Sequence, residues 1–449
     1  MPTQISYDTI VAGGGIAGFS AAVASAGLGA KTLLIERYGF LGGLATAGLV
    51  NPFMTHCTST RHPLIGGIYS AIRAKLAEIG GIRENTFDSE AMKFVLQEMA
   101  IEAGVELLLH SWVSGVVMDG NSVKGLKITN KSGDRTHQAG CTVDATGDGD
   151  VAAFAGAPFE TGGPDGVPQA MTMMFDVGGF DQLRALTYVK DHPDQFRFPM
   201  LPPDSDIEEL ARGIISVAGY YDLVADARKR GEYPLPGDLL FYISRPRPGE
   251  VVFNTTHVGG VNGTNADDLT RAEIEGRRQA AALMRFVKKH VPGFESSYLL
   301  RVASQIGVRE TRRITGRYVF SGEDVAEARK FEDAIARLAY PVDVHSGKGE
   351  GYTKDEEMAV KPVLPPPGDW YEIPYRCLIP LGVESLLVAG RCVSSTQAGH
   401  GAIRIIPCCA ATGQAAGTAA TLSTRENVSV GNLNTGLLLK TLREQGAIV

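Results

Sequence analysis

The chain has 449 residues, which is too long for one hydrophobic core and predicts two or three domains. Its net charge is −7 and its Lys and Arg residues form no block, which argues against a nucleic-acid partner. The sequence holds no run of about 18 apolar residues, which argues against a membrane span. Six cysteines without a CxxC pair favour reduced thiols and a cytoplasmic location.

The N-terminal residues follow the pattern of a strand, a tight turn, a helix and a second strand. The predicted elements are a buried strand at 5–12, a helix of small residues at 16–29 and an apolar strand at 31–35. Because the first strand begins almost at once, we expect no signal peptide.

Gly13, Gly15 and Gly18 stand in the turn with the spacing GxGxxG. The first glycine permits the turn, the second lets a pyrophosphate approach the backbone, and the third lets helix and strand pack closely. The free N–H groups of the helix N-terminus, at Ile16 and Ala17, then face the phosphates. The pattern predicts a bound dinucleotide; the alternative is a glycine turn in an α/β protein without a nucleotide.

Glu36 follows the second predicted strand. A carboxylate at this position accepts hydrogen bonds from ribose hydroxyls and repels a 2′-phosphate. We therefore expect Glu36 to bind the adenosine ribose.

The rest of the chain divides by its pattern. A helix is predicted at 87–103, with strands at 105–109, 113–118, 123–129 and 141–145. From about residue 160 the strands shorten, Gly162–Asp165 and Pro202–Asp204 interrupt the pattern, a charged helix is predicted at 268–289, and a polar loop at 343–368. A strand at 386–389 and an alanine-rich helix at 407–422 then return to the first pattern. We predict an FAD-binding domain at 1–160 and 375–430, an inserted substrate or cap domain at 161–374, and a C-terminal extension at 431–449.

Four segments resemble the cofactor-binding segments of flavoproteins with two dinucleotide-binding domains. They are Glu36-Arg37 leading into residues 39–46, the strand with Ala145-Thr146-Gly147-Asp148, the strand ending at Gly390-Arg391, and the helix after Pro407 with Gln414 and Ala415. Residues 306–318 and 400–404 resemble further signatures of the bacterial FAD-dependent oxidoreductase family, related to the fumarate reductase and glucose-inhibited division flavoproteins.

This resemblance implies an α/β fold: a Rossmann-like FAD-binding domain of the glutathione reductase/fumarate reductase type, with an inserted α+β substrate domain. It also implies FAD as the cofactor. Besides the residues given above, the implied FAD contacts are Gly42, Gly43, Leu44, Ala45, Thr46 and Val113. Positions 44 and 46 offer no histidine, so we expect FAD to be bound non-covalently.

Candidate catalytic residues are His400 and Arg404, which stand four positions apart just before the late helix. An imidazole there could take a hydroxyl proton, and a guanidinium could hold a carboxylate. The alternative is a capping role for His400 and a structural ion pair for Arg404. His257 is a third candidate, in the inserted domain. The charges of residues 309–313 are interpreted as structural ion pairs, with anion binding as the alternative. No metal-ligand spacing is present, so no metal is expected.

The leading hypothesis is an FAD-dependent oxidoreductase that transfers a hydride between a small polar molecule, a hydroxy acid or sugar, and FAD. A flavin-dependent RNA-modifying enzyme and a non-catalytic FAD-binding protein are the alternatives. A homo-oligomer is left open.

Overall fold

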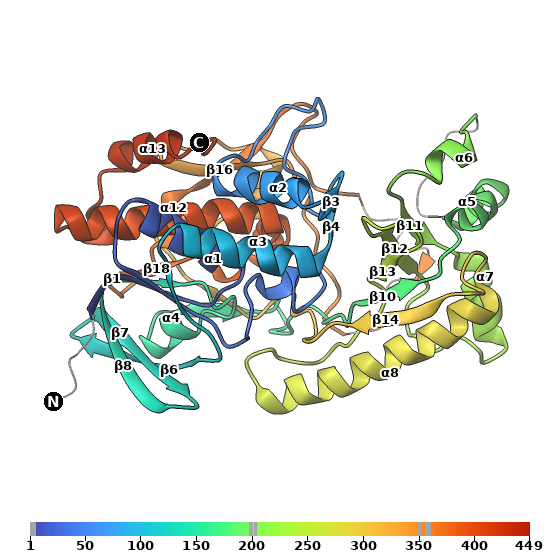
Figure 1. The fold of residues 1–449 in the computed structure, drawn as a ribbon, viewed down its shortest axis with the longest axis horizontal. Coiled ribbons are helices and arrows are strands. Elements are labelled where there is room, and N and C mark those ends of the chain that lie inside the picture. Colours follow the sequence, from blue (N-terminus) through green and yellow to red (C-terminus); the bar gives the residue numbers. More distant parts are fainter. Residues whose placement is uncertain (1–5, 197–200, 202–203, 349–352, 355–360) are drawn as a thin grey trace.

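A seven-stranded sheet organises the N- and C-terminal parts of the chain in the computed structural model, which describes residues 6–196, 201, 204–348, 353–354 and 361–449 (Figure 1). Its parallel strands are β1 (Ser6–Ala12), β2 (Thr32–Ile35), β5 (Glu106–Leu108), β8 (Gly133–Asp144) and β18 (Leu386–Val388). β7 (Ser122–Asn130) and β6 (Trp112–Asp119) continue the sheet in antiparallel pairing from β8. The predicted α/β fold with a Rossmann-like parallel sheet is confirmed.

Two helices of small residues pack against each other beside this sheet. They are α1 (Ile16–Gly27) and α12 (Ile406–Glu426). A Cβ atom on Gly413 would lie 2.1 Å from the carbonyl oxygen of Ala17, and one on Gly417 2.0 Å from that of Ala21. The glycines of α12 therefore let the two helix backbones touch. Pro407 lies in the first turn of α12, as predicted, where its missing N–H has no helical partner to lose.

Two predicted elements differ at their N-terminal ends. The helix predicted from residue 87 is α3 (Ser89–Glu102), because the Asp88 carboxylate accepts hydrogen bonds from the N–H groups of Glu90 and Ala91 and so caps it. The strand predicted from residue 141 begins at Gly133. Its first half is polar and exposed and pairs with β7, so hydrophobicity alone does not reveal it.

A second, antiparallel sheet lies at the other end of the molecule (Figure 1, right). Its strands, in spatial order, are β11 (Ser216–Gly219), β12 (Leu240–Ser244), β13 (Val251–Phe253), β10 (Phe175–Gly178) and β14 (Tyr298–Val302). The helices α5 (Gln182–Asp191), α7 (Tyr221–Lys229) and α8 (Ala266–His290) lie around it. Side chains from these elements form a hydrophobic cluster separate from the one beneath the seven-stranded sheet.

Shorter elements complete the described fold: α2 (Ile68–Glu78), β3 (Ile82–Arg83), β4 (Thr86–Phe87), α4 (Asp150–Phe154), β9 (Phe159–Thr161), α6 (Ile207–Leu210), β15 (Arg312–Ile314), α9 (Gly322–Ala326), β16 (Ala334–Leu338), β17 (Tyr371–Pro374), α11 (Gln397–Ile403) and α13 (Thr435–Glu444). Side chains of β16 and β17 belong to the first hydrophobic cluster, although they precede residue 375. The domain boundaries at 160, 374 and 430 stay predictions. Pro202, Pro203 and residues 349–352 and 355–360 of the polar loop predicted at 343–368 lie outside the described residues. No helix within the described ranges is long and apolar enough to cross a membrane.

Candidate functional site

A cavity of about 700 Å³ lies between the two sheets. The parallel strands β1, β2, β8 and β18 end at its floor, and the residues next after them along the chain line it: Gly13, Glu36, Ala145 and Ala389. The carboxyl ends of parallel strands are where ligands bind in open α/β sheets. The cavity therefore stands where the sequence predicted a dinucleotide.

The three glycines of the first turn serve different purposes. Gly13 has φ +93°, and a Cβ there would lie 2.5 Å from the carbonyl oxygen of Ala145. A Cβ on Gly18 would lie 1.8 Å from the carbonyl oxygen of Gly13. Gly15 has an ordinary φ of −63°, and the nearest atom to its Cβ would be Gly43 Cα at 3.8 Å. Gly13 and Gly18 are thus required by the fold, whereas Gly15 leaves space that belongs to the cavity.

Glu36 is 5% exposed and borders the cavity. Its two carboxylate oxygens accept hydrogen bonds from the N–H groups of Gly14 at 2.6 Å and Tyr38 at 2.9 Å. Burial raises the pKa of this carboxyl, and the hydrogen bonds from Tyr38 and Gly14 offset part of the rise. The backbone thus fixes the carboxylate at the cavity edge; ribose binding stays a prediction.

Most of the predicted cofactor contacts line the cavity. They are Gly13, Gly15, Ile16, Ala17, Glu36, Arg37, Gly42, Gly43, Leu44, Ala45, Val113, Ala145, Thr146, Gly147, Gly390 and Arg391. Ile405, Ile406 and Cys409 bring the N-terminus of α12 to the same cavity. Two helix N-termini and a glycine-lined floor suit the pyrophosphate and the flavin of FAD.

Five predicted cofactor residues lie outside the cavity lining: Gly18, Thr46, Asp148, Gln414 and Ala415. The Thr46 hydroxyl donates to the Leu41 carbonyl at 2.7 Å, and the Gln414 side-chain oxygen accepts from the Ile68 N–H at 3.0 Å. Ala415 is fully buried in α12. Asp148 accepts a hydrogen bond from Arg391 at 2.8 Å, so it orients a side chain that does line the cavity.

A polar cluster occupies another part of the lining. It consists of His257, Arg309, Tyr340, Asp343, His345 and Arg404, hereafter the polar cluster. The Asp343 carboxylate lies 3.0 Å from Arg404 Nη2 and 3.3 Å from His345 Nε2. The rings of His257 and His345 have centroids 5.9 Å apart. Arg309 donates to the carbonyl of Ala170 at 2.7 Å and so is held at the wall.

Burial is the main reason why the pKa values of both imidazoles lie below the ordinary histidine value, so both rings are neutral at neutral pH. Burial, together with the Arg309 charge, lowers the pKa of His345 to about 4 and that of His257 to about 3. Burial would raise the pKa of the Asp343 carboxyl, but His345, Arg404 and Arg309 hold it below its usual value. A neutral His345 that donates from Nε2 to the ionised Asp343 has its lone pair on Nδ1. The arrangement supplies a proton acceptor beside two guanidinium groups.

The structure separates the three predicted catalytic residues. His257 and Arg404 line the cavity, whereas His400 is fully buried in α11 and does not line it. Burial and the charges of Arg404, Arg391 and Arg313 hold the pKa of His400 well below its usual value. Because His400 does not line the cavity, a histidine that does line it is the better candidate for the proton acceptor.

His345 and Asp343 were not among the residues predicted from the sequence, and for Arg309 structural ion pairs were preferred over anion binding. Its neighbours do form ion pairs: Arg313 contacts Glu310, and Arg312 lies 2.8 Å from Asp150. The Asp-x-His spacing at 343–345 was an available signal, because it places a carboxylate beside an imidazole. Among the described residues, no group of three or more His, Cys, Asp or Glu side chains could hold a metal ion.

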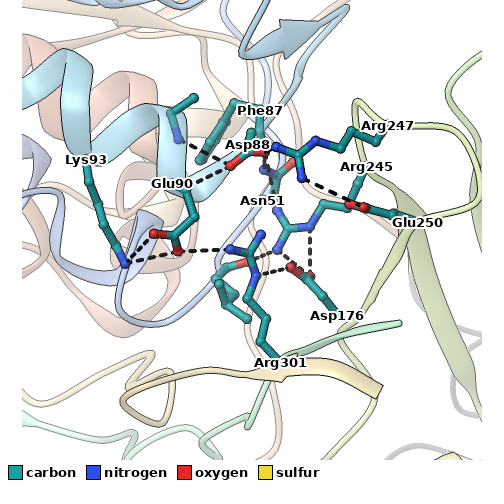
Figure 2. A network of polar contacts seen from close by, with 12 residues as sticks. Asn51, Phe87, Asp88, Glu90, Lys93, Asp176, Arg245, Arg247, Glu250 and Arg301 are labelled. Atoms are coloured by element: carbon teal, nitrogen blue, oxygen red, sulfur yellow. Dashed lines mark hydrogen bonds and ion pairs between the residues drawn. The ribbon is translucent and has the colours of Figure 1, made fainter. Parts of the chain in front are cut away.

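A polar network positions a further wall of the cavity (Figure 2). Asp176 on β10 is about 1% exposed and accepts from Arg245 at 2.6 and 2.8 Å. Its other oxygen accepts from Arg301 at 2.7 Å, and Arg301 also reaches Glu90 on α3 at 2.9 Å. Arg245 donates in addition to the Leu49 carbonyl at 3.5 Å. The network thus fixes the five-stranded sheet against the segment before Val50, Asn51 and Pro52, which line the cavity.

The parallel sheet, the glycine turn and the cavity at the strand ends define a dinucleotide-binding protein with a Rossmann-like fold. The chain belongs to the FAD dependent oxidoreductase family, whose model matches residues 8–445. It is therefore an FAD-dependent oxidoreductase, as the sequence predicted, and its cofactor is FAD.

Solved structures that match the chain share little sequence with it. A geranylgeranyl bacteriochlorophyll reductase-like protein from Thermoplasma acidophilum is 14% identical, with a TM-score of 0.47, and the match covers 99% of this chain and 84% of that one. A myxobacterial chondrochloren halogenase is 14% identical, with a TM-score of 0.44 and coverages of 98% and 79%. The L-proline dehydrogenase from P. horikoshii is 12% identical, with a TM-score of 0.43 and coverages of 98% and 99%. No curated protein sequence matches the chain.

Replacing Gly15 by valine is expected to weaken FAD binding while the protein still folds. The new side chain meets no protein atom closer than 3.8 Å at Cβ, but it enters the space at the glycine turn. Forcing a side chain into a filled site costs about 1–3 kcal/mol, which corresponds to roughly 5- to 150-fold in Kd. FAD titration followed by protein fluorescence measures the effect.

Gly27→Ala is the matched control, because a Cβ at this exposed helix position has no atom within 4 Å. Its FAD affinity should equal that of the wild type. Equal affinity in Gly15→Val would contradict the placement of the pyrophosphate beside Gly15.

Proposed function

We propose that this FAD-dependent oxidoreductase oxidises a small hydroxy acid bound at the polar cluster. The observation that carries the proposal is the meeting of Arg309, Arg404 and a neutral His345 on one cavity wall. Bound FAD supplies the two-electron acceptor for such an oxidation. We also propose that the protein is related to the fumarate reductases and the glucose-inhibited division flavoproteins. In the same proposal, residues 161–374 form an inserted substrate domain.

The side chains of the cluster have distinct roles in the proposal. Arg309 and Arg404 bind the substrate carboxylate, since a guanidinium matches a carboxylate with paired donors. His345 accepts the substrate hydroxyl proton at Nδ1, and Asp343 orients its ring through Nε2 at 3.3 Å. The buried Nε2 atom of His257 has no hydrogen-bond partner among the described residues, and in the proposal a substrate oxygen supplies that partner.

The cluster favours an acid over a neutral sugar. Two guanidinium groups and one carboxylate leave a net positive charge when both imidazoles are neutral. A bound carboxylate balances this charge, whereas a neutral sugar leaves it in place. We therefore prefer the hydroxy acid among the two substrate types that the sequence suggested.

Anaerobic titration of the FAD-loaded protein separates these substrates. Lactate, 2-hydroxyisocaproate, mandelate and glucose are added, and the loss of flavin absorbance is followed. We expect hydroxy acids to bleach the flavin and glucose to leave it oxidised. Bleaching by glucose would overturn the proposal. Failure of every hydroxy acid to bleach the bound FAD would overturn it as well.

The rate should depend on pH through His345. The proton acceptor must be neutral, so kcat/KM for flavin reduction is constant at neutral pH and falls as pH drops toward the free-enzyme pKa of about 4. A bound carboxylate offsets the Arg309 charge that lowers this pKa, so the acidic limb of kcat lies at higher pH. Stopped-flow measurements of flavin reduction after a pH jump give the acidic limb of kcat/KM and that of kcat. An acidic limb of kcat/KM near the ordinary histidine pKa would contradict this account.

A further inference from the structure

One face of the five-stranded sheet is apolar and looks into the cavity. Successive side chains of a strand point to opposite sides, so alternate residues share a face. Ala218 on β11 pairs with Phe241 on β12, and Ser216 pairs with Ile243. These four residues line the cavity. Their neighbours Val217, Leu240 and Tyr242 are at most 1% exposed in the second hydrophobic cluster.

Three more apolar side chains extend this face. Leu235 and Leu239, from the segment between α7 and β12, line the cavity, as does Met174 just before β10. We call Met174, Ala218, Leu235, Leu239, Phe241 and Ile243 the apolar arm. Ser216 lies beside the arm on β11, the edge strand of the sheet, and is exposed. The arm therefore continues from the cavity toward solvent at this edge.

The apolar arm is linked to the polar cluster through Asn254. The Phe241 carbonyl accepts hydrogen bonds from the Asn254 N–H and from the Thr255 hydroxyl, both at 2.9 Å. The side-chain oxygen of Asn254 in turn accepts from Arg309 Nη2 at 3.4 Å. Arg309 and the backbone of Phe241 are thus both held by Asn254, and both residues line the cavity.

We infer that the substrate carries an apolar alkyl or aryl side chain and that this group lies in the apolar arm. The inference rests on the proposed function, which places the acid group at the polar cluster. The six side chains of the arm carry no hydrogen-bonding group. A hydroxylated tail there would lose its hydrogen bonds with water and gain none from these six side chains. An apolar tail instead gains the free energy of leaving water.

The test measures binding of carboxylates to the FAD-loaded protein by calorimetry. Acetate, butyrate and hexanoate share the acid group and differ in tail length, and gluconate matches hexanoate in chain length with a hydroxylated tail. Each methylene that enters the arm should tighten Kd about fourfold, from ~0.8 kcal/mol per buried CH₂. Gluconate should bind no more tightly than acetate.

Ala218→Leu narrows the arm and distinguishes it from a non-specific apolar surface. We expect hexanoate to bind this variant at least tenfold more weakly and acetate to bind within twofold of the wild type. Leu299→Ala on β14 is the control, because this residue is 45% exposed and does not line the cavity. Its carboxylate affinities should be unchanged.

The outcomes separate the two proposals. Equal affinity for acetate and hexanoate, or hexanoate binding unchanged by Ala218→Leu, would overturn the apolar arm and leave the proposed function standing. Absence of binding by every carboxylate would overturn the proposed function and the inference with it.

Discussion

Replacing His345 by glutamine should slow flavin reduction by a hydroxy acid by about 10²- to 10⁴-fold, the usual contribution of a positioned general base. The amide is not basic enough to take the hydroxyl proton, although it can still donate to Asp343. Binding of FAD and of a non-reducing carboxylate should persist, because Arg309, Arg404 and the glycine turn are untouched. Anaerobic stopped-flow spectroscopy measures the rate, and calorimetry measures the affinity.

Two further variants serve as a control and a comparison for His345→Gln. His62→Gln changes an exposed histidine whose ring stacks on Trp370 outside the cavity. A hydroxy acid should reduce the flavin of this variant at the wild-type rate. Asp343→Asn should slow reduction less than His345→Gln, because Asp343 orients the imidazole without receiving the proton. A wild-type rate in His345→Gln would remove His345 from the mechanism.

Replacing Arg245 by methionine should lower the free energy of unfolding by about 3 kcal/mol, the lower end of the range for breaking a buried ion pair. The change leaves one oxygen of the buried Asp176 carboxylate without its charged partner. Arg301 still holds the other oxygen at 2.7 Å, which limits the loss. Urea denaturation followed by circular dichroism measures the difference.

Arg247→Met is the matched control, since Arg247 stands two residues away and pairs with Asp88 at 3.0 Å while 69% of its side chain is exposed. An exposed pair contributes only about 0–1 kcal/mol. Equal losses in the two variants would show that burial of the Arg245–Asp176 pair does not set its contribution.

The local parts of the fold could be predicted from the sequence, because their causes are local. A short apolar run predicted β1, and the glycine turn and runs of small residues predicted α1 and α12. The polar half of β8 could not be predicted from hydrophobicity, since its pairing with β7 leaves those side chains exposed. Gln414 shows the same limit: the helix was predicted, but its packing turns this amide to Ile68 instead of the cavity.

The polar cluster could be predicted only in part, because it is assembled by tertiary contacts. Arg404 was predicted from its place before α12, but its partner Asp343 lies 61 positions away in a segment without helix or strand at that point. His400 has the residue type and spacing of a catalytic group, yet the turn of α11 buries it. Spacing along the chain identified the segment, and only the fold decides which side chains of that segment reach the cavity.

The central claim is that FAD and a hydroxy acid share the cavity, with the acid at the polar cluster. A crystal structure of the FAD-loaded His345→Gln protein with 2-hydroxyisocaproate tests it directly, because the slow variant preserves the bound substrate. We predict the pyrophosphate at Gly15, the carboxylate within about 3 Å of Arg309 or Arg404, and the hydroxyl beside residue 345. The acid bound elsewhere, or FAD outside this cavity, would contradict the account.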